Sequence, residues 1–376
     1  MAFSFWEDQT WLQHHDAIIV GGGIVGVSAA CHLASIHPDW RIAVFERSAF
    51  GDGGTTRNAG FACFGSPAEL LEDRRILGDE AALRLVQSRL EGLAAMRAWL
   101  GDEAVGFQPT GSHALYLNHG TAMPPVSETE LKDLNRWIQP ATRLGQTFYR
   151  KSTLPDRGLA SDALIAVDAS PLEGAVHTGM LHRSLMAKAH AAGISVVRGV
   201  HVRQIEAGSP VRLAVTRSST DPLHEVRTPR CLVATNAFAR ELLPQLDSHP
   251  ASNRVLVTSP VLDPGYQGTY HLEAGYVYAR HLEGGRLLIG GGRHWGLDEA
   301  HTEARLVDWL RAIWPAAARA SIDYAWTGTL GIGSAREPLV ERINEGLVAA
   351  VRLGGMGVAI GVGLGQRAAE LLAKSR

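Results

Sequence analysis

Residues 17–30 read Ala17-Ile18-Ile19-Val20-Gly21-Gly22-Gly23-Ile24-Val25-Gly26-Val27-Ser28-Ala29-Ala30, and the rest of the chain is organised around them. The four apolar residues predict a buried parallel strand, the glycines predict a tight turn, and the apolar positions after them recur at helical spacing. A Gly-x-Gly-x-x-Gly pattern between a strand and a helix is typical of a dinucleotide site. In such a site Gly21 permits the turn, Gly23 leaves room for a pyrophosphate, and Gly26 lets the helix pack closely against the strand.

A second predicted strand, residues 41–45, ends at Glu46, twenty residues after Gly26. A carboxylate at that position accepts hydrogen bonds from ribose hydroxyls, and the N-terminus of the intervening helix offers N–H groups to phosphates. The two features together predict a dinucleotide site. A βαβ unit that binds no ligand is the alternative.

Length and composition indicate a soluble globular protein. The chain has 376 residues, which is long for a single core and favours two domains. Its net charge of −2 gives no electrostatic reason to expect nucleic acid or an anionic membrane as a partner, and no apolar run is long enough to span a bilayer. The N-terminal segment lacks the features of a signal peptide, and the three cysteines show no metal-ligand spacing. We therefore expect a cytoplasmic protein with reduced thiols and no metal.

The remaining segments are of two kinds. Residues 174–197 and 231–237 predict short buried strands and a helix, and residues 347–359 repeat the plan of strand, glycine turn and helix. Residues 253–293 instead alternate as strands do and include an antiparallel hairpin. We therefore predict an α/β fold: a discontinuous Rossmann-like nucleotide domain with an inserted α+β domain built on an antiparallel sheet.

Several motifs occur along the chain in one order: Gly21-x-Gly23-x-x-Gly26, Glu46-Arg47, Thr55-Thr56-Arg57-Asn58-Ala59-Gly60, Ala175-Val176-His177-Thr178-Gly179, Val233-Ala234-Thr235-Asn236 and Gly354-Gly355-Met356-Gly357. In these motifs the chain resembles the FAD-dependent amine and amino-acid oxidases of the D-amino-acid oxidase fold, which include glycine oxidase, sarcosine oxidase and γ-glutamylputrescine oxidase. The resemblance implies an FAD-binding domain of residues 1–75, 165–237 and 330–376. Residues 76–164 and 238–329 would form the substrate domain.

The resemblance also implies which residues hold FAD. The first glycine turn and Glu46 would hold the ADP half, Val202 would contact the adenine side, and residues 55–60, a loop of small and polar residues, would follow the ribityl chain and the flavin. The closing glycine turn would present N–H groups to the pyrimidine edge of the flavin. The full set is Gly21, Gly23, Gly26, Glu46, Arg47, Thr55, Thr56, Arg57, Asn58, Ala59, Gly60, Val202, Thr235, Gly354, Gly355, Met356, Gly357 and Val358. We expect non-covalent FAD, because no cysteine lies where sarcosine oxidase attaches its flavin.

In this family the antiparallel sheet roofs the flavin, which would place Tyr276, Tyr278 and Arg280 over the substrate. Their spacing puts all three on one face of a strand. An aromatic pair buried against a helix is the alternative. His294 and Tyr278 are candidates to accept a proton from the substrate ammonium, although a single histidine is more often structural.

The chain departs from glycine oxidase at the two positions where that enzyme binds a substrate carboxylate with arginine. Leu330 and Gly355 stand there, and neither is basic. A bidentate carboxylate contact needs a guanidinium, so a simple α-amino acid lacks its usual anchor. Arg57, Arg280, Arg293 and Arg336 are the available replacements. We therefore favour a secondary or substituted amine over free glycine or alanine, with Arg280 holding a more distant anion.

The function implied by the resemblance is oxidation of a C–N bond in a small amine or amino acid. Hydride would pass from the substrate carbon to flavin N5, and the resulting imine would hydrolyse. Oxygen or another acceptor would then take the electrons. An NAD-linked dehydrogenase is an alternative, although the second glycine turn at Gly354 argues against it. A flavin-binding protein without turnover is the other alternative.

Overall fold

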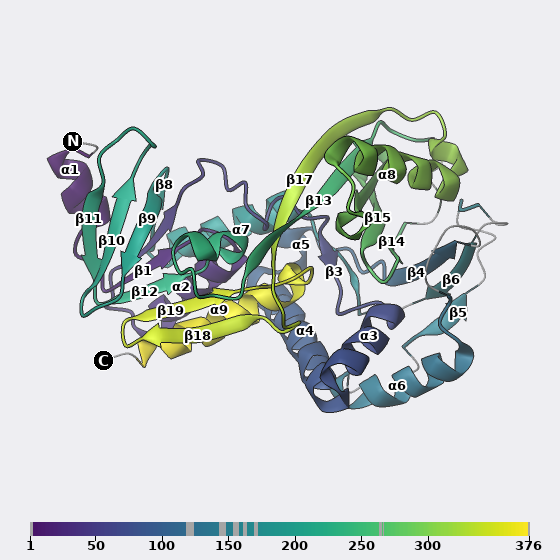
Figure 1. The fold of residues 1–376 in the computed structure, drawn as a ribbon, viewed down its shortest axis with the longest axis horizontal. Coiled ribbons are helices and arrows are strands. Elements are labelled where there is room, and N and C mark those ends of the chain that lie inside the picture. The colour runs from purple at the N-terminus through teal and green to yellow at the C-terminus, as the bar shows by residue number, and fades with distance from the viewer. Residues whose placement is uncertain are drawn as a thin grey trace.

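The computed structural model describes residues 3–117, 124–142, 148–152, 158–160, 164–168, 172–262, 265 and 267–374. Within these ranges the chain builds two large sheets, each with helices packed against it, and both termini lie beside the first sheet (Figure 1). The division into an FAD-binding domain and a substrate domain, with the boundaries given above, stays a prediction, and β6 (Leu164–Asp168) of the second sheet lies largely in the range assigned to the FAD-binding domain.

The glycine-rich strand lies inside the first sheet. Six strands of the described chain pair in the order β18-β19-β12-β1-β2-β8, and every pair is parallel except β18 with β19. Segments far apart in the chain therefore return to one sheet, as the sequence predicts. The strands are β1 Ala17–Val20, β2 Ile42–Glu46, β8 Ser195–Arg198, β12 Arg230–Val233, β18 Leu339–Asn344 and β19 Leu347–Val351.

Different layers cover the two faces of this sheet. Helices α2 (Ile24–Ile36), α7 (Thr178–Ala191) and α9 (Gly357–Ala373) share one apolar core with one face of it. A smaller antiparallel sheet packs its apolar side chains on the opposite face. That sheet consists of β9 His201–Glu206, β10 Val211–Thr216 and β11 His224–Thr228.

Two glycines allow the close packing around the turn between β1 and α2. Gly21 has φ +114°, and a Cβ atom built there would lie 2.7 Å from the carbonyl oxygen of Ala234. A Cβ at Gly26 would lie 1.9 Å from the carbonyl oxygen of Gly21. Real Cβ atoms do not approach oxygen this closely. A side chain at Gly26 would therefore push α2 away from β1, and one at Gly21 would push the turn away from the segment that follows β12.

The second sheet is mostly antiparallel. Eight strands of the described chain pair in the order β17-β13-β16-β15-β14-β4-β6-β5, and β14 with β4 is a parallel pair. The pairing of β15 with β16 confirms the predicted hairpin. The strands are β4 Ser112–Leu117, β5 Arg150–Ser152, β6 Leu164–Asp168, β13 His249–Thr258, β14 Thr269–Leu272, β15 Val277–Leu282, β16 Arg286–Gly291 and β17 Ile322–Ile332.

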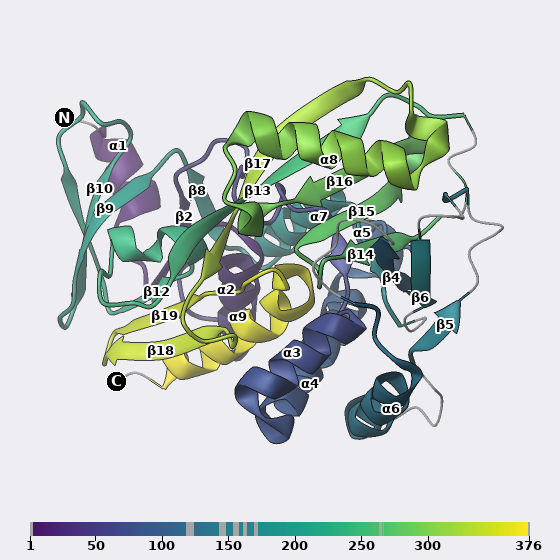
Figure 2. The ribbon, with the colours of Figure 1, turned by 45° about the vertical axis from the view of Figure 1, so that its right-hand side comes forward.

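The pleat gives this sheet two different faces. Helix α8 (Glu299–Ile313) lies across one face (Figure 2), where Leu306, Leu310 and Ile313 join the apolar core. Side chains alternate between faces along a strand, so Val255, Tyr278 and their neighbours point to the other face. That second face packs against the loop that carries Ala59 and Phe61.

Helix α4 (Asp79–Leu100) joins the two halves. Its Leu93, Met96 and Leu100 belong to the core of the first sheet, whereas Val86 packs with α3 (Pro67–Leu77), α6 (Glu128–Thr142) and β4. The shorter elements are α1 Phe5–Glu7, η1 Asp8–Leu12, β3 Phe61–Ala62, α5 Asp102–Val105, β7 Gly174–Ala175, η2 Asn236–Glu241, η3 Glu283–Gly285, η4 Arg293–Trp295 and η5 Pro315–Ala317. No helix in the described ranges is long and apolar enough to cross a membrane.

A buried carboxyl group ties β4 to the segment after β3. Glu173 is fully buried and accepts hydrogen bonds from the backbone N–H groups of Phe64, at 2.7 Å, and Gly65, at 3.4 Å, and from the hydroxyl of Ser112. Burial raises the pKa of this carboxyl group to about 7, because a buried charge loses its hydration.

We predict that Gly26→Ala lowers the free energy of unfolding by about 3 kcal/mol or more, because the added methyl group overlaps the carbonyl of Gly21. Gly363→Ala in α9 is the matched control. A Cβ at Gly363 would meet its nearest neighbour, the Cα of Gly92, at 3.6 Å, which is an ordinary contact. Urea unfolding followed by circular dichroism measures both variants, and equal stabilities would contradict the tight approach of α2 to β1.

We predict that Glu173 makes the protein less stable as the pH rises from 4.5 to 7. The folded state holds this proton more tightly than the unfolded state, whose pKa is 4.5, so the unfolding free energy falls by roughly 3 kcal/mol across that window. Glu173→Gln keeps the hydrogen bonds without the proton exchange and should lose this part of the pH dependence. Urea unfolding midpoints of the wild type and of Glu173→Gln, measured at pH 4.5 and pH 8, test this prediction. Equal shifts of the midpoint with pH in the two proteins would contradict it.

Candidate functional site

A cavity of about 1230 Å³ lies between the two large sheets. It extends from the N-terminus of α2 and the ends of β2 and β12 to the face of the second sheet opposite α8. Residues 327–330 and 332–333, from β17 and the adjoining loop, and residues 352–358 before and at the start of α9 also line it. The cavity therefore joins the predicted nucleotide site to the predicted substrate site.

Most of the predicted site residues lie in its wall. Those that line the cavity are Gly21, Gly23, Glu46, Arg47, Thr55, Arg57, Asn58, Ala59, Val202, Thr235, Tyr276, Tyr278, His294, Gly354, Gly355, Met356, Gly357 and Val358. Gly26, Thr56, Gly60 and Arg280 do not belong to the lining.

The glycine turn is held open by side chains from two later segments. The carboxylate of Glu46 accepts hydrogen bonds from the N–H groups of Gly22, at 2.7 Å, and Ser48, at 2.8 Å. The N–H of Ile24, the first residue of α2, donates to the hydroxyl of Thr55 at 2.9 Å. A Cβ at Gly23 would meet nothing closer than this hydroxyl, at 3.1 Å, so a ligand can approach the backbone there.

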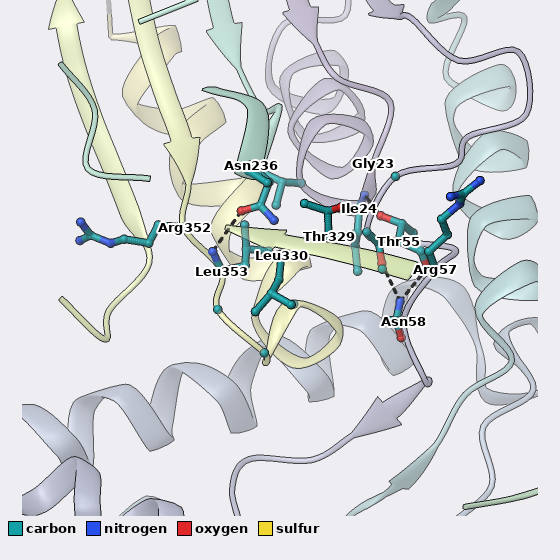
Figure 3. Close-up of a pocket in the computed structure, with 18 of the residues that line it drawn as sticks. Gly23, Ile24, Thr55, Arg57, Asn58, Asn236, Thr329, Leu330, Arg352 and Leu353 are labelled. Carbon is teal, nitrogen blue, oxygen red and sulfur yellow. Dashed lines mark hydrogen bonds between the residues drawn. The ribbon is translucent and has the colours of Figure 1, made fainter. Parts of the chain in front are cut away.

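The loop of residues 55–60 is fixed by its own hydrogen bonds and by β17. The side-chain amide of Asn58 donates to the carbonyls of Gly54 and Thr55, both at 2.8 Å, as the dashed lines from Asn58 in Figure 3 show. The indole N–H of Trp326 donates to the carbonyl of Arg57 at 3.1 Å. A Cβ at Gly328 would lie 2.4 Å from that same carbonyl oxygen, so the loop and the strand are in direct backbone contact.

The closing glycine turn leaves free space in front of α9. A Cβ at Gly354 or Gly355 would meet no atom within 4 Å. The side-chain oxygen of Asn236 accepts a hydrogen bond from the N–H of Leu353 at 3.2 Å and so holds the start of the turn (Figure 3). The first N–H groups of any helix lack an acceptor within the helix and carry partial positive charge, so this end of α9 suits an anionic or electron-rich group.

These observations fit FAD. The open glycine backbone at α2 can receive a pyrophosphate, and the carboxylate of Glu46 lies where a ribose is expected. Thr235 at the end of β12 lines the cavity, and its buried hydroxyl has no hydrogen-bond partner within the described residues. A bound ligand would satisfy that hydroxyl.

The position of the Tyr278 ring on the second sheet requires a glycine beneath it. Tyr278 pairs with Gly290 across the strands, and a Cβ at Gly290 would lie 2.6 Å from the ring of Tyr278. The ring therefore lies over β16. Tyr276, which precedes β15, carries the guanidinium of Arg293 over its ring at 4.4 Å.

Arg280 differs from its predicted role. It lies on the same face of β15 as Tyr278, but the loop of Ala59 and Gly60 covers that end of the strand. Its guanidinium donates to the carbonyls of Ala59, at 3.1 Å, Gly60, at 3.3 Å, and Val176, at 2.9 Å. These bonds hold the flavin loop against the sheet and leave the group outside the cavity lining, so we no longer assign a substrate anion to it.

The other predicted arginines divide into two groups. Arg336 lines the cavity but pairs with Glu72 at 3.1 Å and with Asp73 at 3.7 Å. In the described part of the chain, neither Arg57 nor Arg293 is paired with a carboxylate, and both line the cavity. These two are therefore the cations available to a ligand.

The two predicted proton acceptors are less suitable than the sequence indicated. The ring nitrogen Nε2 of His294 is 2.5 Å from the carboxylate of Glu273, which also accepts the indole N–H of Trp295 at 2.9 Å. Burial raises the pKa of Tyr278 to about 12. Tyr278 therefore stays protonated and suits a hydrogen-bond donor.

Sequence reasoning missed several lining residues, because each stands alone in its segment. They are Glu69 and Asp73 of α3, Arg89 of α4, Asn253 of β13, His271 of β14 and Arg352 after β19. Glu69 belongs to the capping box Ser66-x-x-Glu69, but that motif marks the start of α3 and not a ligand site. Pairing of their strands and packing of α3 bring them to one cavity.

Comparisons with known proteins agree on one family. A family model described as FAD dependent oxidoreductase matches residues 16–371. Probable oxidoreductase OrdL of Rhizobium meliloti is 27% identical over 379 residues, covering 95% of this chain and 82% of that protein. Gamma-glutamylputrescine oxidoreductase of Escherichia coli is 25% identical over 372 residues, covering 95% and 83%. The structure of glycine oxidase from Geobacillus kaustophilus matches with a TM-score of 0.73 at 21% identity over 96% of this chain and 95% of that one, which is a likeness of fold.

We predict that Gly23→Val yields folded protein without flavin. The added side chain would enter the open space where the glycine backbone faces the cavity, and it would meet there only the end of a threonine side chain. Absorbance near 450 nm relative to 280 nm reports FAD content, and circular dichroism reports folding. Full FAD occupancy in a folded variant would contradict the placement of the pyrophosphate at this turn.

Proposed function

The chain belongs to the family of FAD-dependent oxidoreductases, and from this premise we propose that it oxidises a C–N bond of a small amine or amino acid. Within that class we propose a secondary or substituted amine in preference to free glycine or alanine. FAD, when bound, supplies the acceptor for the hydride that leaves the substrate carbon. The rest of the task belongs to the residues of the cavity.

The observation that carries the proposal is a group of hydrogen-bond acceptors in the lining of the cavity. The carboxylate of Glu69, the side-chain oxygen of Asn253 and a ring nitrogen of His271 belong to residues that line it. Within the described residues, the Asn253 oxygen and His271 Nε2 are buried without a partner. Unpartnered buried acceptors are costly, and the N–H groups of an amine would satisfy them.

The relatives support the same class of substrate. The Escherichia coli relative is named for gamma-glutamylputrescine, a substituted amine. The residues Leu330 and Gly355 also favour a substituted amine, because both line the cavity and neither has a guanidinium to pair with a carboxylate beside the reacting carbon. Arg293, over Tyr276 at the roof, is the cation available to an anion elsewhere in the substrate.

The residues of the cavity would act by positioning and by excluding water. Tyr278 and Phe61 form an aromatic wall, with ring centroids 5.6 Å apart. The Tyr278 hydroxyl, which stays protonated, can donate a hydrogen bond to a substrate oxygen or a nitrogen lone pair. Holding the substrate carbon in a dry site with its C–H bond directed at the cofactor accounts for much of the rate enhancement in such reactions.

We predict that anaerobic mixing with a secondary amine bleaches the flavin faster than mixing with glycine or D-alanine. The panel contains sarcosine, N-alkyl amines and γ-glutamylated amines beside the two amino acids, and stopped-flow absorbance measures the reduction rate. A protein that is reduced fastest by a simple α-amino acid would refute the preference. No reduction by any member of the panel would refute C–N oxidation itself.

A further inference from the structure

His271 occupies an unusual position on the roof of the cavity. It lies on β14 directly opposite Tyr278 of β15, and its side chain is 6% exposed. The ring lines the cavity and meets Phe61 edge-on, with centroids 5.1 Å apart. Its Nε2 atom has no hydrogen-bond partner within the described residues. An apolar residue would serve better here if packing were its only role.

The other ring nitrogen faces a carboxylate. Glu69 Oε2 lies 3.8 Å from His271 Nδ1, which is ion-pair distance but too long for a hydrogen bond. Glu69 is fixed there because it caps α3, where Oε2 accepts the N–H of Ser66 at 2.9 Å. Gly275, with φ +77°, makes room for it, since a Cβ at that glycine would lie 2.6 Å from the carboxyl carbon.

A carboxylate beside Nδ1 sets the protonation of the ring. Nδ1 then carries the hydrogen in the neutral ring, and Nε2 keeps its lone pair. A substrate ammonium in the cavity needs such a lone pair, because its nitrogen must lose a proton before the neighbouring C–H bond can give up a hydride. Tyr278 keeps its phenol proton and is a weak base, and His294, whose Nε2 is bonded to Glu273, is 29% exposed. His271 Nε2 is instead buried and has no partner within the described residues.

We propose that His271 is the catalytic base for the substrate ammonium and that Glu69 is its positioning residue, an inference that rests on the proposed amine oxidation. In this step one N–H bond of the ammonium breaks and the proton forms a bond to His271 Nε2. The electron pair stays on the substrate nitrogen, and no oxidant takes part. The charge that appears on the imidazole is offset by the carboxylate of Glu69.

The charges around His271 leave it in the accepting form near neutral pH. Burial and His113 on β4 lower its pKa below the usual value, whereas Glu69 on α3 raises it. Tyr278 faces it from β15 and stays protonated. The ring is therefore neutral before the substrate binds and ready to accept a proton.

The test is the pH dependence of flavin reduction in the holoenzyme carrying His271→Gln. Without a base, only the neutral fraction of the substrate reacts, and that fraction rises tenfold for each pH unit below the amine pKa of about 10. We expect a loss of roughly 10²–10³ in the rate constant at pH 7, the usual contribution of a general base, shrinking steadily toward pH 10. With a fluorinated amine of lower pKa as substrate, the loss in the rate constant of flavin reduction at pH 7 should be much smaller. A loss that is equal at every pH would overturn the proposal.

Glu69→Gln tests the positioning role in a protein whose α3 cap is preserved, because the amide oxygen can still accept the N–H of Ser66. Nitrogen-15 NMR of the imidazole should show a lower pKa for His271 in this variant and more hydrogen on Nε2. Glu72→Gln on the same helix, whose carboxylate pairs with Arg336, should change neither. An unchanged His271 in the Glu69 variant would overturn the pairing.

The outcomes separate this inference from the proposed function. If an amine reduces the wild-type flavin and the loss in His271→Gln does not depend on pH, amine oxidation is supported and the role of His271 as the base is refuted. If no amine reduces the wild-type flavin, both the proposed amine oxidation and the role of His271 are refuted. The NMR measurement reads the Glu69 and His271 pair directly and does not depend on turnover.

Discussion

The close approach of α2 to β1 is the constraint on which the other features depend. It is possible because Gly26 lacks a side chain, and a single methyl group there would fall 1.9 Å from the carbonyl oxygen of Gly21. The approach places the free N–H groups at the start of α2 beside the carboxyl end of the sheet. Glu46 and Thr55 then hold the turn open through hydrogen bonds to Gly22 and Ile24. A nucleotide site is the result of backbone geometry more than of any charged side chain.

The second sheet completes the site through its pleat. One face of it is covered by α8 and forms a core, and the opposite face is directed at the loop that precedes β3 and at the cavity. Arg280 fastens this loop to the sheet with its guanidinium bonded to three carbonyl groups, and Trp326 and Gly328 bring β17 against Arg57. The cofactor loop and the substrate roof are therefore one connected structure.

Sequence reasoning succeeded where the signal is local. The glycine spacing, Glu46, the closing glycine turn and the hairpin of β15 and β16 each lie within one short segment, and each is found in the expected element. It was less successful with side-chain partners. The spacing of Arg280 correctly predicted which face of the strand it lies on. It could not predict its partners, because the carbonyl groups that accept its hydrogen bonds belong to residues 59, 60 and 176. Glu69 and His271 are far apart in the chain, and the capping box that contains Glu69 predicts only the start of a helix, so their proximity is visible only in the structure.

The central claim is that one cavity holds the whole cofactor between the glycine turn of α2 and the Tyr278 face of the second sheet. The most direct measurement is a crystal structure of the purified holoprotein. The account predicts the ADP half of FAD along residues 21–24 beside Glu46, with the flavin ring between the start of α9 and the ring of Tyr278. Electron density for the flavin ring outside that space, or on the side of the second sheet covered by α8, would contradict it.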